Sequence, residues 1–592
     1  MAKVMKLPNL ENHVSRNGFD LSFRTLFSDN CGEIMPVNAI PIFPGDKMKF
    51  ECGDFARTAP VNTAAYQRFK SFYDFIFVPY SVLWNQFGNF ITDMQVDSNQ
   101  YASSLVSGRL PSSKVPHVST KDLSTYINRL KQSNSKNVFG FSDASNVIRL
   151  LDGLDYGYFA ESLTNVDSKV NEELEALTLA AYQKSYYDHY RFDQWEDYKP
   201  HCCNFDYLNG TNTLVPISTL PIGGIASDNL LTLRYSNFER DLLFGILPEQ
   251  QLGDTSVVQL NIDSKSYTVG SFLEVDKKTT QPGTLTSPSP LNQYQSFSPI
   301  VQSATANFHL SAAGVANLGK ALNSNFDILQ LRAAEYLQKY KEIANCNDRD
   351  VKSQIEAFWG VKVPAIVSHR SIFVDSIQGS ISINEAINTN LTGGASADIQ
   401  GVGRGSADGT VYFDNNKYGN EHGVLLILHR VIPLLDYRLT GARSFHKNIL
   451  YGDFPNPAFD KLGYQPNNYL DYFNDNQTKK QFGTLSDGHI GFVPRYAEYK
   501  TNIDTVKGAF RESSALAAWV APVTSQQMIT YVSVNQPGVN VAVSHYLFKI
   551  NPHMCDTIFN PVSDDYATHH FFTAFAAKVD AVRNFDYNGL PY

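Results

Sequence analysis

The sequence predicts a mainly β protein, an antiparallel sandwich or barrel interrupted by long, partly helical insertions. Short apolar stretches such as Val424–Leu428 and Ile432–Leu435 alternate with turn residues over the last third of the chain, as in all-β folds. The run Phe72–Val78 is aromatic or β-branched except for Asp74, which predicts a strand buried on both faces. The chain has 592 residues. Because a single hydrophobic core stops growing near roughly 250–300 residues, the chain must form more than one domain or one core with long insertions.

Residues 1–60 are expected to be extended. Prolines spaced along an apolar stretch favour an edge strand or a strap over a central strand, and this region contains Pro36, Pro41 and Pro44. After Pro79, apolar side chains recur at spacings of three and four as far as Met94, and Ser81 is a suitable N-cap. We therefore expect one helix from Ser81 to Met94, packed beside the buried strand.

Helices are also expected further along the chain, at Leu123–Leu130 and Val147–Leu154. Within Ala181–Trp195, tyrosines recur at helical spacing, at Tyr182, Tyr186 and Tyr190. Such a stripe could stack nucleic-acid bases, at about 1–3 kcal/mol per base. Packing in the core or between subunits is the more ordinary role of aromatic side chains, and we expect that role here.

Residues 255–325 are polar and rich in turn residues, and a loop of that length usually has a function of its own. The next segment, Phe326–Ala344, has an apolar helical stripe, and Ile381–Asn388 is expected to be a strand. The segment Gly393–Gly409 is expected to be a flexible loop. Its glycine spacing does not fit a dinucleotide fingerprint, and it lacks the Gly-Lys-Ser/Thr of a phosphate-binding loop.

Several blocks of sequence resemble one viral family. They are YDFIFVPYSVLW (73–84), AYQKSYYDHYRFDQW (181–195), LTLRYSNFERDLLFGILPEQQLGD (231–254) and GFVPRYAEYK (491–500). These blocks are similar to the major capsid proteins of the microviruses, which are small single-stranded DNA bacteriophages, and of their gokushovirus-like branch in particular. The resemblance reaches both ends of the chain and lapses in the insertions.

The resemblance implies a viral jelly roll, an antiparallel β-sandwich with long, partly helical insertions between strands. It implies a structural major capsid protein, not an enzyme, that self-assembles into an icosahedral shell around a circular single-stranded DNA genome, with surface insertions for host attachment. The implied partners are further copies of the chain, the packaged DNA, a small basic DNA-binding protein, scaffolding or pilot proteins, and a bacterial host receptor. The expected location is the virion, after assembly in the cytoplasm of the bacterial host.

We expect the chain to divide into a core and insertions. The expected segments are an N-terminal arm with the first strands and helix of the jelly-roll core (1–94), an insertion (95–177), a core-associated segment (178–254), a polar surface insertion that could form a protrusion (255–325), and a helix with the remaining strands and the C-terminal segment (326–592). The polar insertion is the one we expect to face the host.

Any contact with DNA must be local. The chain carries 49 basic and 58 acidic residues, a net charge of −9, so its overall field does not attract nucleic acid. The first residues contain only Lys3 and Lys6 as cations and lack a basic arm. One cluster mixes cations with rings that could stack bases, and it is the candidate DNA contact: Arg495, Tyr496, Tyr499, Lys500, Lys507 and Arg511. The alternatives for this cluster are a contact between subunits and a strand whose long side chains extend their polar ends to solvent.

No catalytic, cofactor-binding or metal-binding residue is predicted. The chain has no G-x-S-x-G elbow, complete zinc pattern or EF-hand loop. His569 and His570 would point to opposite faces of a strand, which suits structural histidines better than metal ligands. Asp348 and Asp350 are expected in a solvated turn.

The cysteine count and the lengths of the apolar runs indicate the cellular environment of the protein. Six cysteines in so long a chain indicate a reducing compartment and not a disulfide framework. No membrane insertion is expected, because no apolar run approaches the roughly 18 residues of a spanning helix. Jelly rolls also serve lectins and cupins, so the alternative function is that of a β-sandwich carbohydrate-binding protein or enzyme.

Overall fold

The computed structural model divides the chain into two compact units, Met1–Gln250 with Asn347–Tyr592, and Gln251–Cys346. The described residues are 15–61, 65–92, 114–159, 171–208, 213–222, 228–253, 273–275, 308–310, 328–364, 368–384, 402–437, 441–474, 476, 480, 489–511, 514–521, 523, 530–536, 539–559 and 569–587. The N-terminal tail discussed above therefore lies outside them. So does the polar insertion at 255–325, apart from the backbone of two short strands.

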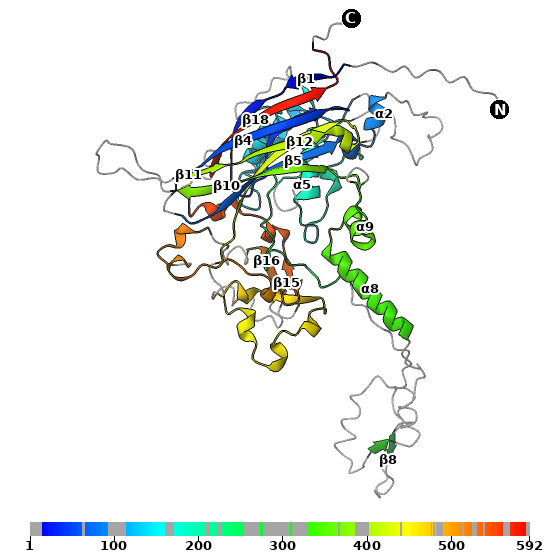
Figure 1. Cartoon of the computed structure of the whole chain (residues 1–592), viewed down its shortest axis with the longest axis vertical. Helices are drawn as coiled ribbons and strands as arrows, with labels where there is room; N and C mark the ends of the chain where they lie inside the picture. Colours follow the sequence, from blue (N-terminus) through cyan, green and yellow to red (C-terminus); the bar gives the residue numbers. More distant parts are fainter. Residues whose placement is uncertain are drawn as a thin grey trace, which may run out of the picture. The chain divides into compact units, whose positions relative to one another are not determined.

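A ten-stranded sheet forms the main structural element of the larger unit. Its strands follow the order β1-β18-β4-β11-β10-β5-β13-β3, with β12 paired to β4 and β2 to β18. Figure 1 shows this sheet as a curled layer in which the blue β4 lies beside the red β18. The strands are β1 (Asn17–Asp20), β2 (Phe23–Asp29), β3 (Met35–Ile42), β4 (Lys47–Thr58), β5 (Phe69–Pro79), β10 (Ile372–Asn384), β11 (Val402–Ser406), β12 (Asp408–Asp414), β13 (Gly423–Pro433) and β18 (Phe571–Arg583).

Short hairpins and helices complete the described chain. The hairpins pair β6 (His117–Ser119) with β7 (Glu173–Glu175), β8 (Leu273–Val275) with β9 (Phe308–Leu310), β14 (Tyr464–Asn468) with β15 (His489–Pro494), and β16 (Val532–Gln536) with β17 (Val539–Val543). The α-helices are α1 (Tyr80–Leu83), α2 (Phe87–Ile91), α3 (Thr120–Gln132), α4 (Asp143–Gly153), α5 (Leu177–His189), α8 (Ile328–Cys346), α9 (Val351–Trp359) and α11 (Ala497–Lys500). The predicted fold class is confirmed: the protein is mainly antiparallel β, of the jelly-roll type, with partly helical insertions.

Strands β5 and β13 lie inside the sheet and are buried on both faces. They pair along their whole length. One face of the pair, which includes Ile76 and Leu426, packs against α3, α4 and α5. The other face, which includes Phe75 and Leu425, packs inside the curl against β4, β12 and β18. The prediction of a strand buried on both faces is therefore confirmed.

The one charged residue of that predicted strand, Asp74, is fully buried. Its carboxylate accepts hydrogen bonds from Tyr190 Oη at 2.6 Å, Ser376 Oγ at 2.5 Å and Arg430 Nε at 2.9 Å. A buried carboxylate is tolerated only when it is paired and hydrogen-bonded. These contacts tie β5 to β10, to β13 and to the C-terminal end of α5.

The single helix predicted from Ser81 to Met94 is wrong. Two short helices, α1 and α2, form instead, and Trp84 between them has extended backbone angles, with φ −151° and ψ 109°. The backbone N–H and the side-chain amide of Asn85 donate to Asp206, at 2.8 and 2.6 Å. Hydrogen bonds to a distant carboxylate thus replace helical ones. The spacing of three and four arises because side chains of both short helices pack against one apolar cluster.

The prediction of a loop at Gly393–Gly409 is wrong for its described part. Residues 402–406 form β11, and β12 begins at Asp408. A Cβ atom on Gly403 would lie 2.6 Å from Thr58 Cγ2, and one on Gly405 would lie 2.5 Å from Ile381 Cγ1. These glycines therefore allow β11 to approach its neighbours closely, a use of glycine in strands that resembles a loop signal in the sequence.

Other predicted elements change in detail. The stretches predicted as separate strands at 424–428 and 432–435 belong largely to one strand, β13. Asp350 does not lie in a simple solvated turn. It caps α9 by accepting a hydrogen bond from Ser353 N at 3.0 Å, and it forms an ion pair with Arg370.

The end of the sheet at β2 and β18 contains buried ionisable groups. Arg149 Nη2 lies 2.6 Å from Glu33 Oε2, and this pairing outweighs burial and lowers the pKa of Glu33 to about 2. His569 Nδ1 lies 2.6 Å from Ser28 Oγ. Burial, assisted by the charge of Arg149, lowers the pKa of His569 to about 4. His570 instead contacts Asp556, with 3.0 Å between Nε2 and Oδ1, so the two histidines have separate contacts, and both precede β18.

The pKa of His569 makes stability dependent on pH. Below about pH 6.5 the unfolded chain binds a proton at this histidine, whereas the folded chain does not until about pH 4. The free energy of unfolding should therefore fall as pH drops from 6.5 to 4, by on the order of 1.4 kcal/mol per unit of pKa difference. Denaturant titrations of the unassembled chain across this range should show a smaller fall for His569→Gln. The exposed His446→Gln should behave like the unmodified chain, and equal slopes for all three would contradict the prediction.

Candidate assembly and nucleic-acid surfaces

The six residues predicted to contact DNA fall into two groups. Arg495, Tyr496, Tyr499 and Lys500 lie where β15 ends and α11 begins. Tyr496 forms the turn with φ +59°, in the left-handed region that bulky residues rarely adopt. Lys507 and Arg511 flank a separate short 3-10 helix, Gly508–Phe510. Among the described residues, no hydrogen bond, ion pair or ring contact joins the two groups.

Other groups of the protein already engage the cations of the first group. Lys500 Nζ lies 2.6 Å from Asp460 Oδ1 and donates to the backbone oxygen of Arg495 at 2.9 Å. The guanidinium carbon of Arg495 lies 5.3 Å from the centroid of the Tyr496 ring, a cation–π distance. The Asp460 carboxylate therefore offsets the charge of Lys500, whereas the ring contact leaves the charge of Arg495 in place.

The two tyrosines of the first group bind the neighbouring segment through their hydroxyls. Tyr499 Oη accepts a hydrogen bond from Asn448 Nδ2 at 2.6 Å, and Tyr496 Oη accepts one from the backbone N–H of Asn456 at 3.3 Å. The Tyr499 ring is 46% exposed, so one side of it remains open to solvent. The first group therefore acts as a support for residues 448–460, with one stackable ring at its surface.

The tyrosine stripe of the 181–195 block is part of the core. Tyr182, Tyr186 and Tyr190 are all buried. Tyr182 Oη donates to the backbone oxygen of Ile34 at 2.9 Å, and the guanidinium carbon of Arg234 lies 4.7 Å from the Tyr186 ring centroid. The packing role is confirmed and the base-stacking alternative is wrong, because nucleic acid cannot reach these rings in the folded chain.

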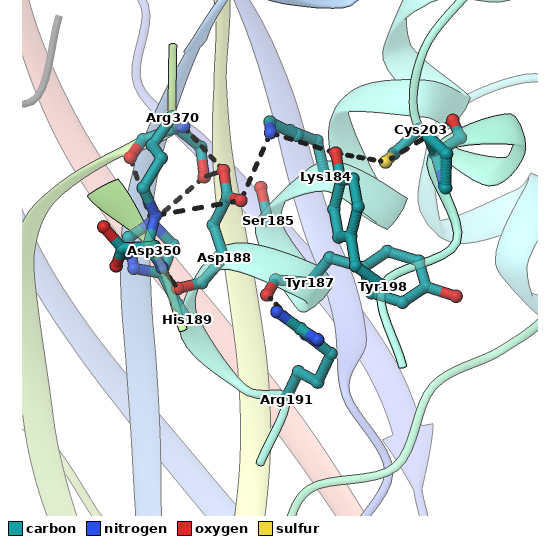
Figure 2. A network of polar contacts seen from close by, with 12 residues as sticks. Lys184, Ser185, Tyr187, Asp188, His189, Arg191, Tyr198, Cys203, Asp350 and Arg370 are labelled. Atoms are coloured by element: carbon teal, nitrogen blue, oxygen red, sulfur yellow. Dashed lines mark hydrogen bonds and ion pairs between the residues drawn. The ribbon is translucent and has the colours of Figure 1, made fainter. Parts of the chain in front are cut away.

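A buried polar network joins α5 to the start of β10, and Figure 2 shows Asp188 at its centre. The Asp188 carboxylate lies 3.3 Å from Lys184 Nζ and 3.8 Å from Arg370 Nε. It also accepts hydrogen bonds from the backbone N–H and the hydroxyl of Ser371, both at 2.8 Å. Because Arg370 also pairs with Asp350, the network fixes α9 to the same site.

The histidine and the cysteine of Figure 2 are uncharged near pH 7. Burial lowers the pKa of His189 to about 4, so the ring is neutral near pH 7. Burial raises the pKa of Cys203 to about 11, so its sulfur stays a thiol and not the reactive thiolate. The network therefore serves to hold α5, α9 and the residues before β10 together.

A cavity of about 70 Å³ lies among α3, α4, α5 and residues 228–235 and 545–549. Its wall includes two ion pairs, Lys549 with Glu196 at 3.1 Å and Arg234 with Asp228 at 3.1 Å. Burial lowers the pKa of Lys549, although Glu196 opposes that shift. Each of these four charged groups therefore has a partner of opposite charge within the wall of the cavity.

Within the described part of the chain, no group of three or more His, Cys, Asp or Glu residues is arranged to hold a metal ion. The described helices include none that is both long and apolar enough to cross a membrane.

A family model described as capsid protein (F protein) matches residues 9–149 and 151–526. The chain belongs to this capsid protein family. A similar relative is the capsid protein VP1 of Chlamydia phage 1, which is 25% identical over 204 residues, or 34% of this chain and 34% of the relative. The match thus spans about a third of the relative's length. The resemblance to microvirus capsid proteins is confirmed, and the chain has a structural role as a phage capsid protein of the virion.

An exposed apolar segment is the surface feature of this capsid protein that the sequence analysis missed. Ile449, Leu450 and Tyr451 are consecutive and 83%, 70% and 94% exposed. Further exposed apolar side chains follow or precede them in the same stretch, at Phe445, Phe454, Phe459 and Leu462. Single exposed apolar residues are normal, but a contiguous group marks an interaction site. We name residues 445–462 the apolar segment.

The Asp188 network yields a stability prediction for this capsid protein. Asp188→Asn would leave Lys184 and Arg370 without their shared carboxylate, and breaking a buried pair in this way costs about 3–5 kcal/mol. Asp504→Asn is the matched control, because the Arg68–Asp504 pair is exposed and such pairs contribute about 0–1 kcal/mol. Denaturant unfolding of the unassembled chain measures both. Similar small losses in the two variants would show that the network does not fasten α5.

Proposed function

We propose that copies of this chain assemble into a closed icosahedral shell around a circular single-stranded DNA genome, in the cytoplasm of the bacterial host, and that the chain has no catalytic activity. The observation that carries the proposal is the apolar segment on a chain of a capsid protein family. Aromatic and aliphatic side chains are enriched at the core of contacts between proteins. Burying them against a second copy removes apolar surface from water, which is the main favourable term in association.

The contacts around the apolar segment support its use as an interface. Tyr496 holds the backbone N–H of Asn456, and Tyr499 holds the side-chain amide of Asn448. A segment held in place loses less conformational entropy when it binds, so more of its burial contributes to affinity. In this proposal the β15–α11 turn serves assembly, and Lys507 and Arg511 keep their role as candidate DNA contacts.

Replacing the three most exposed neighbours should block assembly without unfolding the chain. The triple variant Ile449→Asn, Leu450→Asn and Tyr451→Asn should raise the concentration needed for assembly at least tenfold. Substitutions at exposed positions usually change the free energy of unfolding by only about 0.5 kcal/mol each. Light scattering and negative-stain electron microscopy measure the particles, and thermal melting checks the fold.

The matched control is Tyr158→Asn, which also removes an exposed ring, in this case 58% exposed and outside the apolar segment. It should assemble like the unmodified chain. Particles of unchanged size and concentration dependence from the triple variant would refute the role of the apolar segment.

We further propose that the polar insertion at 255–325 contacts the host receptor. Two facts support this: the insertion falls within the separate compact unit Gln251–Cys346, and long polar loops in compact proteins commonly carry binding functions. In this proposal the larger unit builds the shell. Scaffolding or pilot proteins assist assembly, and a small basic protein supplies the positive charge that the acidic chain lacks.

Deleting the insertion tests this assignment. Virions in which residues 255–325 are replaced by a short Gly-Ser linker should form particles of normal size, yet their adsorption to permissive bacteria should fall to background. Electron microscopy and an adsorption assay measure the two properties separately. Normal adsorption by intact particles would place receptor binding elsewhere.

A further inference from the structure

Arginines and aromatic rings meet on the solvent-facing side of the sheet where β18, β4 and β11 lie side by side. Phe572 on β18 is opposite Arg57 on β4, and Arg57 is in turn opposite Arg404 on β11. Phe55 lies on the same face of β4, because side chains alternate along a strand. Arg24 reaches this face from β2. We name these five residues the arginine patch.

Two guanidinium groups of the arginine patch lie within cation–π distance of the Phe55 ring, and both phenylalanines of the patch are accessible. The guanidinium carbons of Arg57 and Arg404 lie 5.0 and 5.1 Å from the centroid of the Phe55 ring. Phe55 is 36% exposed and Phe572 is 45% exposed. A planar guanidinium held on a ring keeps its N–H groups directed outward, in the geometry that binds phosphate.

The positive charge of the patch is not neutralised within the described chain. Among the described residues, no ion pair or side-chain hydrogen bond involves Arg24, Arg57 or Arg404. Two carboxylates lie nearby on this face. Asp408 lies beside Gly53, and no ion pair joins it to the patch, while Glu51 forms ion pairs with Lys49 and Lys578. Like charges placed directly opposite on neighbouring strands are destabilising. An anion bound between Arg57 and Arg404 would relieve that repulsion.

Small side chains lie between the members of the patch, and the exposed Leu26 lies opposite Ala574 at its edge. Ala574 is opposite Phe55, and Ser382 is opposite Arg404. Along the neighbouring row, Ala576 is opposite Gly53. Because these side chains are short, a planar group has room to lie against the two exposed phenylalanine rings.

We propose that the arginine patch binds single-stranded nucleic acid, with phosphates on the guanidinium groups of Arg57, Arg404 and Arg24 and bases against Phe55 and Phe572. Accessible cations beside stackable rings are the two features that single strands require, because their phosphates and their base faces are both exposed. This inference rests on the proposed function, in which the chain encloses a single-stranded genome. It adds a site formed by residues far apart in the sequence.

Charge complementarity favours nucleic acid over a second copy of the chain. The chain has a net charge of −9, so unneutralised arginines gathered on one face stand out against an acidic background. An interface between copies would leave these guanidinium groups buried without partners unless the facing surface supplied carboxylates. A polyanion supplies a negative charge at every nucleotide.

The first test measures binding of fluorescent oligo(dT) to the unassembled chain by polarisation at several salt concentrations. The double variant Arg57→Gln, Arg404→Gln should bind at least tenfold more weakly. The slope of log K against log salt should become shallower by about 1.4, because single strands release about 0.7 counterion per phosphate neutralised. Phe55→Leu should weaken binding with an unchanged slope. Arg68→Gln, which removes an exposed arginine already paired with Asp504, is the control and should bind normally.

The second test uses the unmodified chain, so it does not depend on how variants fold. Ultraviolet cross-linking to oligo(dT), followed by peptide mapping, should label peptides of β4, β11 or β18. Labelling confined to residues 495–511, or unchanged affinity in a folded double variant, would overturn the inference. So would a double variant that binds DNA normally but no longer assembles, since the patch would then be an interface between copies. A chain that assembles but never binds DNA would overturn this inference and leave the shell proposal standing.

Discussion

The need to cover two central strands on both faces shapes the whole molecule. β5 and β13 present large apolar side chains in both directions, so one face needs the helices α3, α4 and α5, and the other needs the sheet to curl until β4, β12 and β18 close over it. Asp74 sits in this apolar layer as the buried anchor between strand and helix. The segments that contain α3, α4 and α5 are therefore part of the core, since they supply the helical cover that a single sheet lacks.

Local patterns in the sequence predicted the elements whose side chains interact mainly with the core. The apolar run around Asp74, the helices α3 and α4, and the stripe of tyrosines in α5 all carry a periodicity that burial imposes. The break at Trp84 and the strand β11 could not be predicted in this way. Each depends on a partner far along the chain, Asp206 for the first and the packing of Thr58 and Ile381 against glycines for the second.

The candidate binding surfaces also divide into those that a local sequence pattern reveals and those that only the fold brings together. The residues from Arg495 to Lys500 were found because they are close in sequence, yet their charges and hydroxyls are mostly used within the protein. Arg57, Arg404 and Phe572 come from widely separated parts of the chain and meet only through strand pairing, so no sequence window contains the pattern. The exposed run from Ile449 to Tyr451 carries a signal, an apolar triplet between turn residues, but such a triplet equally fits a short buried strand.

The position of β18 has a consequence for how the protein is made. This strand, Phe571–Arg583, lies between β4 on one side and β1 and β2 on the other. While the ribosome is still synthesising the chain, these N-terminal strands have emerged but lack the partner that joins them. The sheet can close only after residues 571–583 have been synthesised, which delays the pairing of the most distant residues and leaves the edge of β4 open to unwanted pairing. Nascent chains of this kind are natural clients for chaperones.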